Sequence, residues 1–388
     1  MSMFGDFNTG SSGSIRFAPK TNFRKLAQMP WSFVALIVGL AVFGTAMLYS
    51  STITNPDVAD LPAKHLTRFA FSFVLMIALA LTPLSYWKTA AIPAYVGTFV
   101  LLIGVEFFGD SGGGAQRWLV LGPLRMQPSE VMKLALVLAV AQYYHAVMKE
   151  NSGGFLIHIP ALALILAPSA LVLRQPDLGT TLTLVAAGGV MIYFAGIYWR
   201  VIFAAIVGAL AALVPAYLYV LEEYQRDRIR ALWDPTADPL GANYQGEQAK
   251  IAIGSGGFDG KGFTQGTQSQ LDFIPEQHTD FIFTVVAEEF GFLGAAALLL
   301  VWLTVIVWGF VISIRSHSLF GRFAGIGAVA TMAFYVAFNV GMVAGLLPVV
   351  GIPLPLISYG GTAMITVMAA FGLILSVYLH REDKLKGR

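Results

Sequence analysis

The stretch PEQHTDFIFTVVAEEFGFLG, from Pro275 to Gly294, joins a strongly polar run directly to an apolar helix. The apolar run extends from Phe281 to Ile314, which is 34 residues or about 51 Å at 1.5 Å per residue. That length exceeds the roughly 30 Å hydrocarbon core of a bilayer, so we expect the helix to project, bend or tilt strongly. The stretch therefore indicates a membrane protein with a polar site at the water boundary.

The composition of the whole chain supports this interpretation. Of its 388 residues, 56% are hydrophobic and 12% are charged, and the mean hydropathy is +0.70. Soluble domains average about 25% charged residues. We therefore predict an all-α integral membrane protein with about ten transmembrane helices. The expected spans are 31–50, 66–82, 92–108, 130–147, 155–173, 178–196, 201–221, 281–313, 323–347 and 360–379.

The distribution of Lys and Arg predicts the orientation. With the N-terminus inside, thirteen of these residues fall on inside segments and five on short outside loops, which places both termini in the cytoplasm. Residues 1–28 are expected to be a disordered cytoplasmic tail without a cleaved signal peptide, residues 29–380 a single membrane domain, and residues 381–388 a second cytoplasmic tail. The absence of cysteine excludes disulfides and thiolate metal sites, and the scattered basic residues argue against nucleic-acid binding.

Three outside segments are too long or too unusual to be simple connectors, and they fall on one face in this topology. They are 109–129, 346–361 and the large extracytoplasmic loop 222–279, between the seventh and eighth helices. In the first, Arg117 suits an anion and Trp118 an apolar or sugar face, although Trp118 also fits an interfacial anchor. Glu130 and Lys133 follow at helical i, i+3 spacing, either as functional charges in the membrane or as a structural pair.

The remaining candidate residues lie further along the chain. Asp177 in RQPDLGTT fits a helix cap. Arg228 is expected beside the membrane. Its guanidinium there either donates two hydrogen bonds to a phosphate group or extends along the interface to reach water. Gln268 belongs to a Gly-, Gln- and Ser-rich surface suited to sugar hydroxyls. His278 and Asp280 fall near the start of the long helix, where Asp280 is either a functional carboxylate or a cap.

The segment from Gly345 to Met364, GLLPVVGIPLPLISYGGTAM, is rigid, apolar and non-helical. Such backbone at membrane depth must be buried in protein or line a cavity. We therefore expect it either to support an acyl or prenyl chain or simply to pack within the protein.

Six stretches together carry a resemblance to a known family. They are GAQRWL, QPSEVMKL, QPDLGTT, YQRDRI, GTQSQLDFIPEQHTDFIF and LPVVGIPLPLISYGG. In this order the stretches resemble the SEDS family of bacterial membrane proteins, over the part of the chain from Gly109 to the last helix. The variants PEQHTDFIF and VGIPLPLISYGG look more like the elongation branch of the family than the division branch.

The resemblance implies a peptidoglycan glycosyltransferase that polymerises lipid II at the outer face of the inner membrane. It also implies a class B penicillin-binding protein and other elongation-complex proteins as partners. The essential aspartate of the family falls on Asp280, which we expect to act as general base. Lys133, Arg117 and Arg228 are the candidates for the leaving pyrophosphate. No cofactor is required by the sequence, but a divalent cation such as Mg or Mn is compatible with it, with Glu130 as a candidate ligand.

Two other functions fit many helices and buried charges. The first is a flippase for the lipid-linked precursor, which is disfavoured because the polar motifs gather on one face and no internal repeat is visible. The second is a non-catalytic scaffold for wall synthesis, which would leave Asp280 and Lys133 without a role.

Overall fold

The computed structural model describes residues 22–112, 115–121, 124–149, 154–219, 223, 226, 230, 242–271, 273–274 and 276–382. Long helices dominate, because a helix satisfies its own backbone hydrogen bonds where no water is available. They are α2 (Trp31–Thr52), α3 (Leu61–Leu81), α4 (Leu84–Phe108), α5 (Pro128–Lys149), α6 (His158–Arg174), α7 (Leu178–Phe194), α8 (Trp199–Tyr219), α12 (Ile282–Ile314), α13 (Leu319–Val343) and α14 (Gly361–Leu379). Each coincides with one of the ten expected spans, so the helical membrane fold is confirmed.

Among the described residues, eight helices are long and apolar enough to cross a membrane, and α7 is a shorter apolar helix. The total of ten spans and the cytoplasmic termini stay predictions. The helices α5, α13 and α14 form the interior of the bundle. In the most apolar 18 residues of each helix, 61%, 67% and 78% of the residues are buried, respectively. The other helices expose many large apolar side chains, which is expected where a helix faces lipid.

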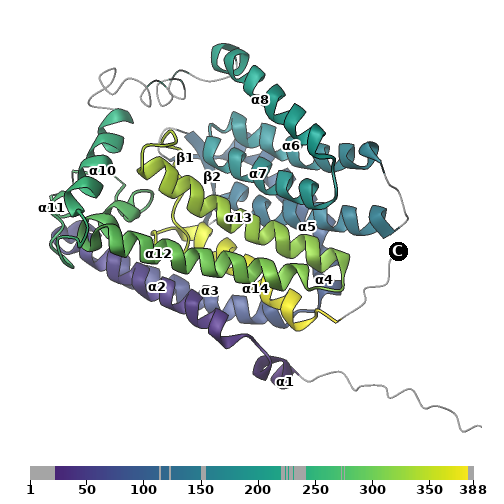
Figure 1. Cartoon of the computed structure of the whole chain (residues 1–388), viewed down its shortest axis with the longest axis horizontal. Helices are drawn as coiled ribbons and strands as arrows, with labels where there is room; N and C mark the ends of the chain where they lie inside the picture. The colour runs from purple at the N-terminus through teal and green to yellow at the C-terminus, as the bar shows by residue number, and fades with distance from the viewer. Residues whose placement is uncertain are drawn as a thin grey trace, which may run out of the picture.

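Smaller elements gather at the two ends of the bundle. The short helices α10 (Ala242–Gly256) and α11 (Thr267–Gln270) lie at one end, and α1 (Asn22–Ala27) lies at the other (Figure 1). Near α1, the Lys25 ammonium lies 2.8 Å from Nε2 of His380, which follows α14. Part of the expected N-terminal tail is thus a helix, and the beginning and end of the described chain meet.

The all-α membrane fold also contains one small sheet, in the segment before α5 that was expected to be an outside loop. Three short strands, β1 (Asp110–Gly112), β2 (Ala115–Leu121) and β3 (Leu124–Met126), form an antiparallel sheet in the order β1-β2-β3. Asp110 pairs with Trp118, and Leu119 with Met126. Trp118 and Val120 are residue types that favour strands, and this small sheet satisfies backbone groups of a segment that leaves the helical bundle.

The long helix α12 bends, which is one of the three outcomes expected from its length. Gly291 has φ 64° and ψ −161°, which interrupts the helix within the chain's most apolar run. The loop after α10 hydrogen-bonds the backbone on both sides of this kink. Lys261 N donates to Glu288 O at 3.0 Å, and Phe292 N donates to Gly257 O at 3.0 Å. The kink therefore leaves few backbone groups unpaired, and these hydrogen bonds join the loop after α10 to α12.

Candidate active site

Asp280 lies in a turn immediately before α12, and Phe281 occupies the N-cap position of that helix. The side chain of Asp280 is half-buried. The buried amide of Asn339 on α13 donates to the backbone oxygens of Asp280 and Ile352, both at 2.7 Å. The aspartate is thus fixed by its backbone between α13 and the proline-rich segment, at the boundary where a helix of the membrane domain begins.

The non-helical segment Leu347–Gly360 packs against this aspartate. A Cβ atom placed on Gly351, whose φ is +67°, would lie only 3.3 Å from Asp280 Oδ2, so glycine allows the close approach. Tyr359 N donates to His278 O at 2.8 Å, and His65 Nε2 lies 3.2 Å from Leu356 O. The segment is therefore held inside the protein, which confirms the expectation for non-helical backbone at this depth.

His278 is held from the opposite side by α2. Its Nδ1 lies 3.1 Å from Ser51 Oγ, at the end of α2. The side chain is half-buried, two residues before Asp280. The structure therefore brings two of the candidate residues, His278 and Asp280, to the same turn.

Glu288 anchors the polar loop that precedes this turn. Its Oε1 accepts hydrogen bonds from Lys261 Nζ at 2.6 Å and Gln268 N at 2.9 Å, and its Oε2 accepts one from Ser269 N at 3.1 Å. The neighbouring Glu289 accepts a hydrogen bond from Ser50 Oγ. Both buried glutamates have the polar partners that their place in an apolar helix required. Gln268 thus uses its backbone for structure, while its half-buried side chain remains a candidate for substrate.

Glu130 and Lys133 form a buried cluster with Tyr335 of α13. Lys133 Nζ donates to Glu130 Oε1 at 2.7 Å and to Tyr335 Oη at 2.6 Å, and Tyr335 Oη donates to Glu130 Oε2 at 2.5 Å. Lys133 is only 3% exposed and Glu130 only 5%. Because both carboxylate oxygens already bind protein groups, Glu130 does not fit the role of metal ligand in this arrangement. The described residues also contain no group of three His, Cys, Asp or Glu side chains that could hold a metal ion.

Arg117 and Trp118 lie on β2, beside the turn between α6 and α7. Arg117 Nε donates to Gln175 O at 3.1 Å, and one terminal nitrogen donates to Pro176 O. The half-buried Trp118 ring lies 5.1 Å from the guanidinium carbon of Arg125. Two donors of Arg117 are therefore used to join the sheet to the α6–α7 turn. Arg228 lies outside the described residues.

Asp177 is the N-cap of α7, as the sequence predicted. Its Oδ1 accepts a hydrogen bond from Thr180 N and its Oδ2 one from Gln127 Nε2, both at 3.0 Å. The cap also joins α7 to the residue that precedes α5. The motifs QPSEVMKL and QPDLGTT thus meet through the side-chain contact between Gln127 and Asp177.

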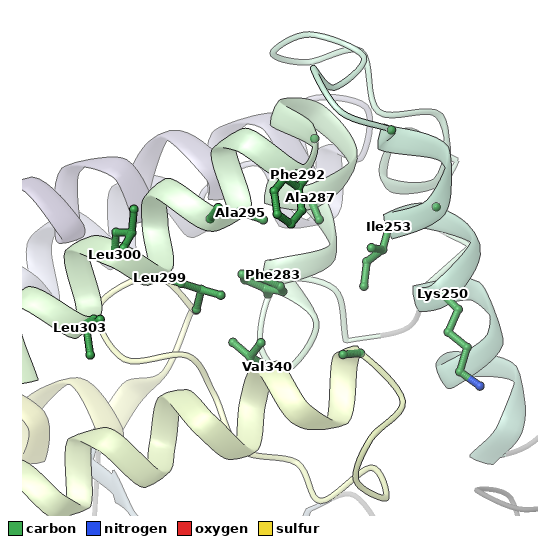
Figure 2. Close-up of a pocket in the computed structure, with 15 residues that line it drawn as sticks. Lys250, Ile253, Phe283, Ala287, Phe292, Ala295, Leu299, Leu300, Leu303 and Val340 are labelled. Carbon is green, nitrogen blue, oxygen red and sulfur yellow. The ribbon is translucent and has the colours of Figure 1, made fainter.

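An apolar groove of about 860 Å³ lies next to the turn that carries Asp280. Figure 2 shows Phe283, Leu299 and Val340 facing the space between α12 and α13, with Lys250 of α10 at its edge. The kink residue Gly291 also lines this groove. Such a lining accommodates hydrocarbon, either of a lipid or of a membrane-spanning helix.

A family model described as a cell cycle protein of the FtsW, RodA and SpoVE type matches residues 27–383. The chain is 40% identical over 368 residues to the peptidoglycan glycosyltransferase MrdB of Escherichia coli K12, which covers 94% of this chain and 97% of MrdB. It is 33% identical over 365 residues to a probable peptidoglycan glycosyltransferase FtsW of Trichlorobacter lovleyi, covering 91% and 94% of the two chains. The chain belongs to the SEDS family.

Solved structures agree with this membership. A chain from a peptidoglycan synthase complex described as coordinating polymerisation and crosslinking superposes with a TM-score of 0.77 at 31% identity, covering 92% of this chain and 99% of the other. The rod shape determining protein RodA of Thermus thermophilus superposes with a TM-score of 0.69 at 28% identity, covering 92% and 98%. This SEDS chain is thus a multi-pass membrane protein with the fold of RodA.

Two residues of the candidate site in this SEDS protein were not predicted from the sequence. Tyr335 and Asn339 both lie in the apolar run 323–347, where an aromatic side chain and a single amide resemble ordinary helix packing. The only signal was their i, i+4 spacing, which places both on one face of α13. Their partners Lys133, Asp280 and Ile352 come from other parts of the chain.

Proposed function

We propose that this protein is a peptidoglycan glycosyltransferase that polymerises lipid II at the periplasmic face of the inner membrane during elongation and rod-shape maintenance. The observation that supports this best is the position of Asp280, whose half-buried carboxylate lies where α12 meets the polar loop that the sequence predicts to be extracytoplasmic. A lipid-linked sugar needs its reacting carbon at this boundary. The names of the relatives, peptidoglycan glycosyltransferases MrdB and FtsW, support the same reaction.

In the proposed reaction, a sugar hydroxyl of one substrate attacks the anomeric carbon of another. Asp280 takes the hydroxyl proton, a carbon–oxygen bond forms at the anomeric carbon, and the bond to the lipid diphosphate breaks. One displacement of this kind inverts the anomeric configuration. Asn339 donates to Asp280 O and to Ile352 O, which holds the turn of the base against the proline-rich segment, so little reorganisation is needed during the reaction.

His278, Gln268 and Trp118 are proposed to bind the sugars or the headgroup of the substrate. Glu130 and Lys133 are proposed to act through their cluster with Tyr335, which fixes α5 against α13. Arg117 is proposed to hold the sheet and the α6–α7 turn in the shape that the substrate requires. Arg228 is retained as a candidate for the leaving diphosphate.

The proposed partner is a class B penicillin-binding protein that crosslinks the glycan, within a larger elongation complex. Its support is the solved structure whose description couples polymerisation to crosslinking, and which shares 31% identity with this chain. Transport of the lipid-linked precursor remains the alternative function. Lipid movement without glycan formation by the reconstituted protein would favour it.

The experiment that tests the function is polymerisation of purified lipid II by the full chain with its partner transpeptidase. Wild type would be compared with Asp280→Asn, which keeps the shape of the side chain and removes the base. Asp259→Asn, an exposed aspartate in the loop before α11, is the matched control. We expect glycan from wild type and the control and none from Asp280→Asn. Equal activity in all three proteins would refute the role of Asp280.

A further inference from the structure

Arg68 of α3 lies beside the turn that carries Asp280. Its guanidinium carbon lies 4.5 Å from the ring centroid of Tyr359, and Tyr359 N donates to His278 O at 2.8 Å. The arginine thus faces the same segment that packs against Asp280, although it comes from a different helix and from outside the family motifs noted above. Its side chain is half-buried, so it remains accessible to a substrate.

Arg68 differs from several other cationic side chains in the partner of its charge. Lys64, Arg125, Lys250 and Lys261 each pair with a carboxylate, as does Lys133 in the buried cluster. Within the described part of the chain, Arg68 forms no ion pair, and its guanidinium lies over the face of the Tyr359 ring. A guanidinium that stacks on a ring keeps its in-plane N–H donors available, and this fork matches phosphate oxygens bidentately.

The guanidinium lies beside Gly361, the first residue of α14. A Cβ atom on Gly361 would lie 3.7 Å from Nη1 of Arg68, in ordinary van der Waals contact. His65, one turn before on α3, is directed to Leu356 O and so holds α3 against the proline-rich segment. Arg68 is therefore presented by a helix that is fixed to the site.

We propose that Arg68 binds the diphosphate of the lipid-linked substrate, with Tyr359 orienting its guanidinium. This assignment rests on the proposed function and adds a residue to its binding site. It is favoured over Lys133, which is buried and bound to Glu130 and Tyr335, and over Arg117, two of whose donors bind carbonyl oxygens. The chemical class recognised is a phosphate ester at the membrane surface.

The test measures binding and therefore does not depend on turnover. Full-length protein in phosphatidylcholine nanodiscs would be titrated with undecaprenyl diphosphate or with undecaprenol, and bound lipid would be counted by native mass spectrometry. We expect wild type to prefer the diphosphate, and Arg68→Ala to bind it about 10- to 100-fold more weakly, because a charged hydrogen-bonding partner is lost. Arg68→Lys keeps the charge without the fork and should fall between the two.

Controls separate the role of Arg68 from general effects. Arg174→Ala removes an exposed arginine at the end of α6 and should bind like wild type. Tyr359→Phe keeps the ring and should retain binding, whereas Tyr359→Leu should weaken it. Thermal unfolding of each variant verifies that it is folded. Undiminished binding by folded Arg68→Ala would overturn the proposal, and so would equal weakening by Arg174→Ala.

Two competition experiments identify which phosphate compound the site recognises. Inorganic diphosphate should displace the lipid only at far higher concentration, and added phosphatidylglycerol should not displace it at equal concentration. Equal potency of either competitor would refute recognition of a lipid-linked substrate. Asp280→Asn should bind undecaprenyl diphosphate like wild type, so the assignment of Arg68 can fail or succeed independently of the base.

Discussion

Tyr335 and Asn339 lie one helical turn apart on α13, and each binds a different half of the site. Tyr335 Oη lies 2.6 Å from Lys133 Nζ, whereas Asn339 Nδ2 lies 2.7 Å from Asp280 O. Residues at i and i+4 share a helix face, so a shift of α13 moves both contacts together. The buried charge cluster and the aspartate are thus joined by one rigid element.

The first prediction concerns Asn339. Asn339→Ala removes two hydrogen bonds to buried carbonyl oxygens, so the turn that carries Asp280 loses its fixed position. We expect kcat for glycan synthesis to fall on the order of 10- to 100-fold with little change in KM, because misplacement of a base slows chemistry more than binding. Steady-state polymerisation kinetics check this.

The control for Asn339 is Ala337→Ser, which alters an exposed residue of the same helix. Its kinetics should match those of wild type. A rise in KM at unchanged kcat in Asn339→Ala would contradict a positioning role and would indicate a direct role in substrate binding.

A second prediction addresses the buried cluster of Glu130, Lys133 and Tyr335. Lys133→Met leaves the Glu130 carboxylate buried without its cation, which should destabilise the protein by about 3–5 kcal/mol. The double variant Glu130→Gln, Lys133→Met removes both charges and should recover much of that loss. Tyr335→Phe should have an intermediate effect, because it removes hydrogen bonds and keeps the ring.

Thermal unfolding in nanodiscs measures these differences. The decisive comparison is between the single and the double variant. If the double variant were less stable than Lys133→Met, the pair would not be coupled as its 2.7 Å contact requires.

A third prediction concerns the anchor of the polar loop. Glu288→Gln weakens the hydrogen bonds from Lys261 Nζ and from the amides of Gln268 and Ser269, because it removes the negative charge. We expect faster hydrogen exchange at the amides of residues 267–270, while exchange in the core of α13 stays unchanged. Exchange mass spectrometry of the full chain checks this, and unchanged exchange in 267–270 would show that Glu288 does not hold the loop.

Sequence reasoning succeeded where a single residue or a local pattern carries the information. Apolar length located the helices, RQPDLGTT located the Asp177 cap, and the excess length of 281–314 predicted a helix that projects, bends or tilts, of which the structure shows the bend at Gly291. It failed where meaning depends on contacts distant in sequence. Tyr335 contacts Glu130 across 205 residues, and nothing in either local sequence distinguishes that contact from packing.

The glycines of the loop 254–262 show the same limit. The sequence suggested a shallow surface that hydrogen-bonds sugar hydroxyls, but the structure uses two of these glycines, Gly256 and Gly260, for close backbone contact with α12. A Cβ on Gly260 would lie 2.2 Å from Glu289 O, and one on Gly256 would lie 2.1 Å from Ala287 O. Composition alone does not distinguish a glycine needed for flexibility from one needed for proximity.

The last prediction tests that contact at the kink. Gly291→Ala places a methyl group 2.4 Å from Gly260 N and forces a residue with a side chain to adopt φ 64°, so the loop must separate from α12. We expect a loss of stability of about 1–3 kcal/mol together with reduced glycan synthesis. The matched control is Gly246→Ala in α10, where a Cβ meets no atom within 4 Å and alanine favours the helix. Because that control should be as stable as wild type or slightly more stable, equal losses in both variants would show that the kink has no special requirement for glycine.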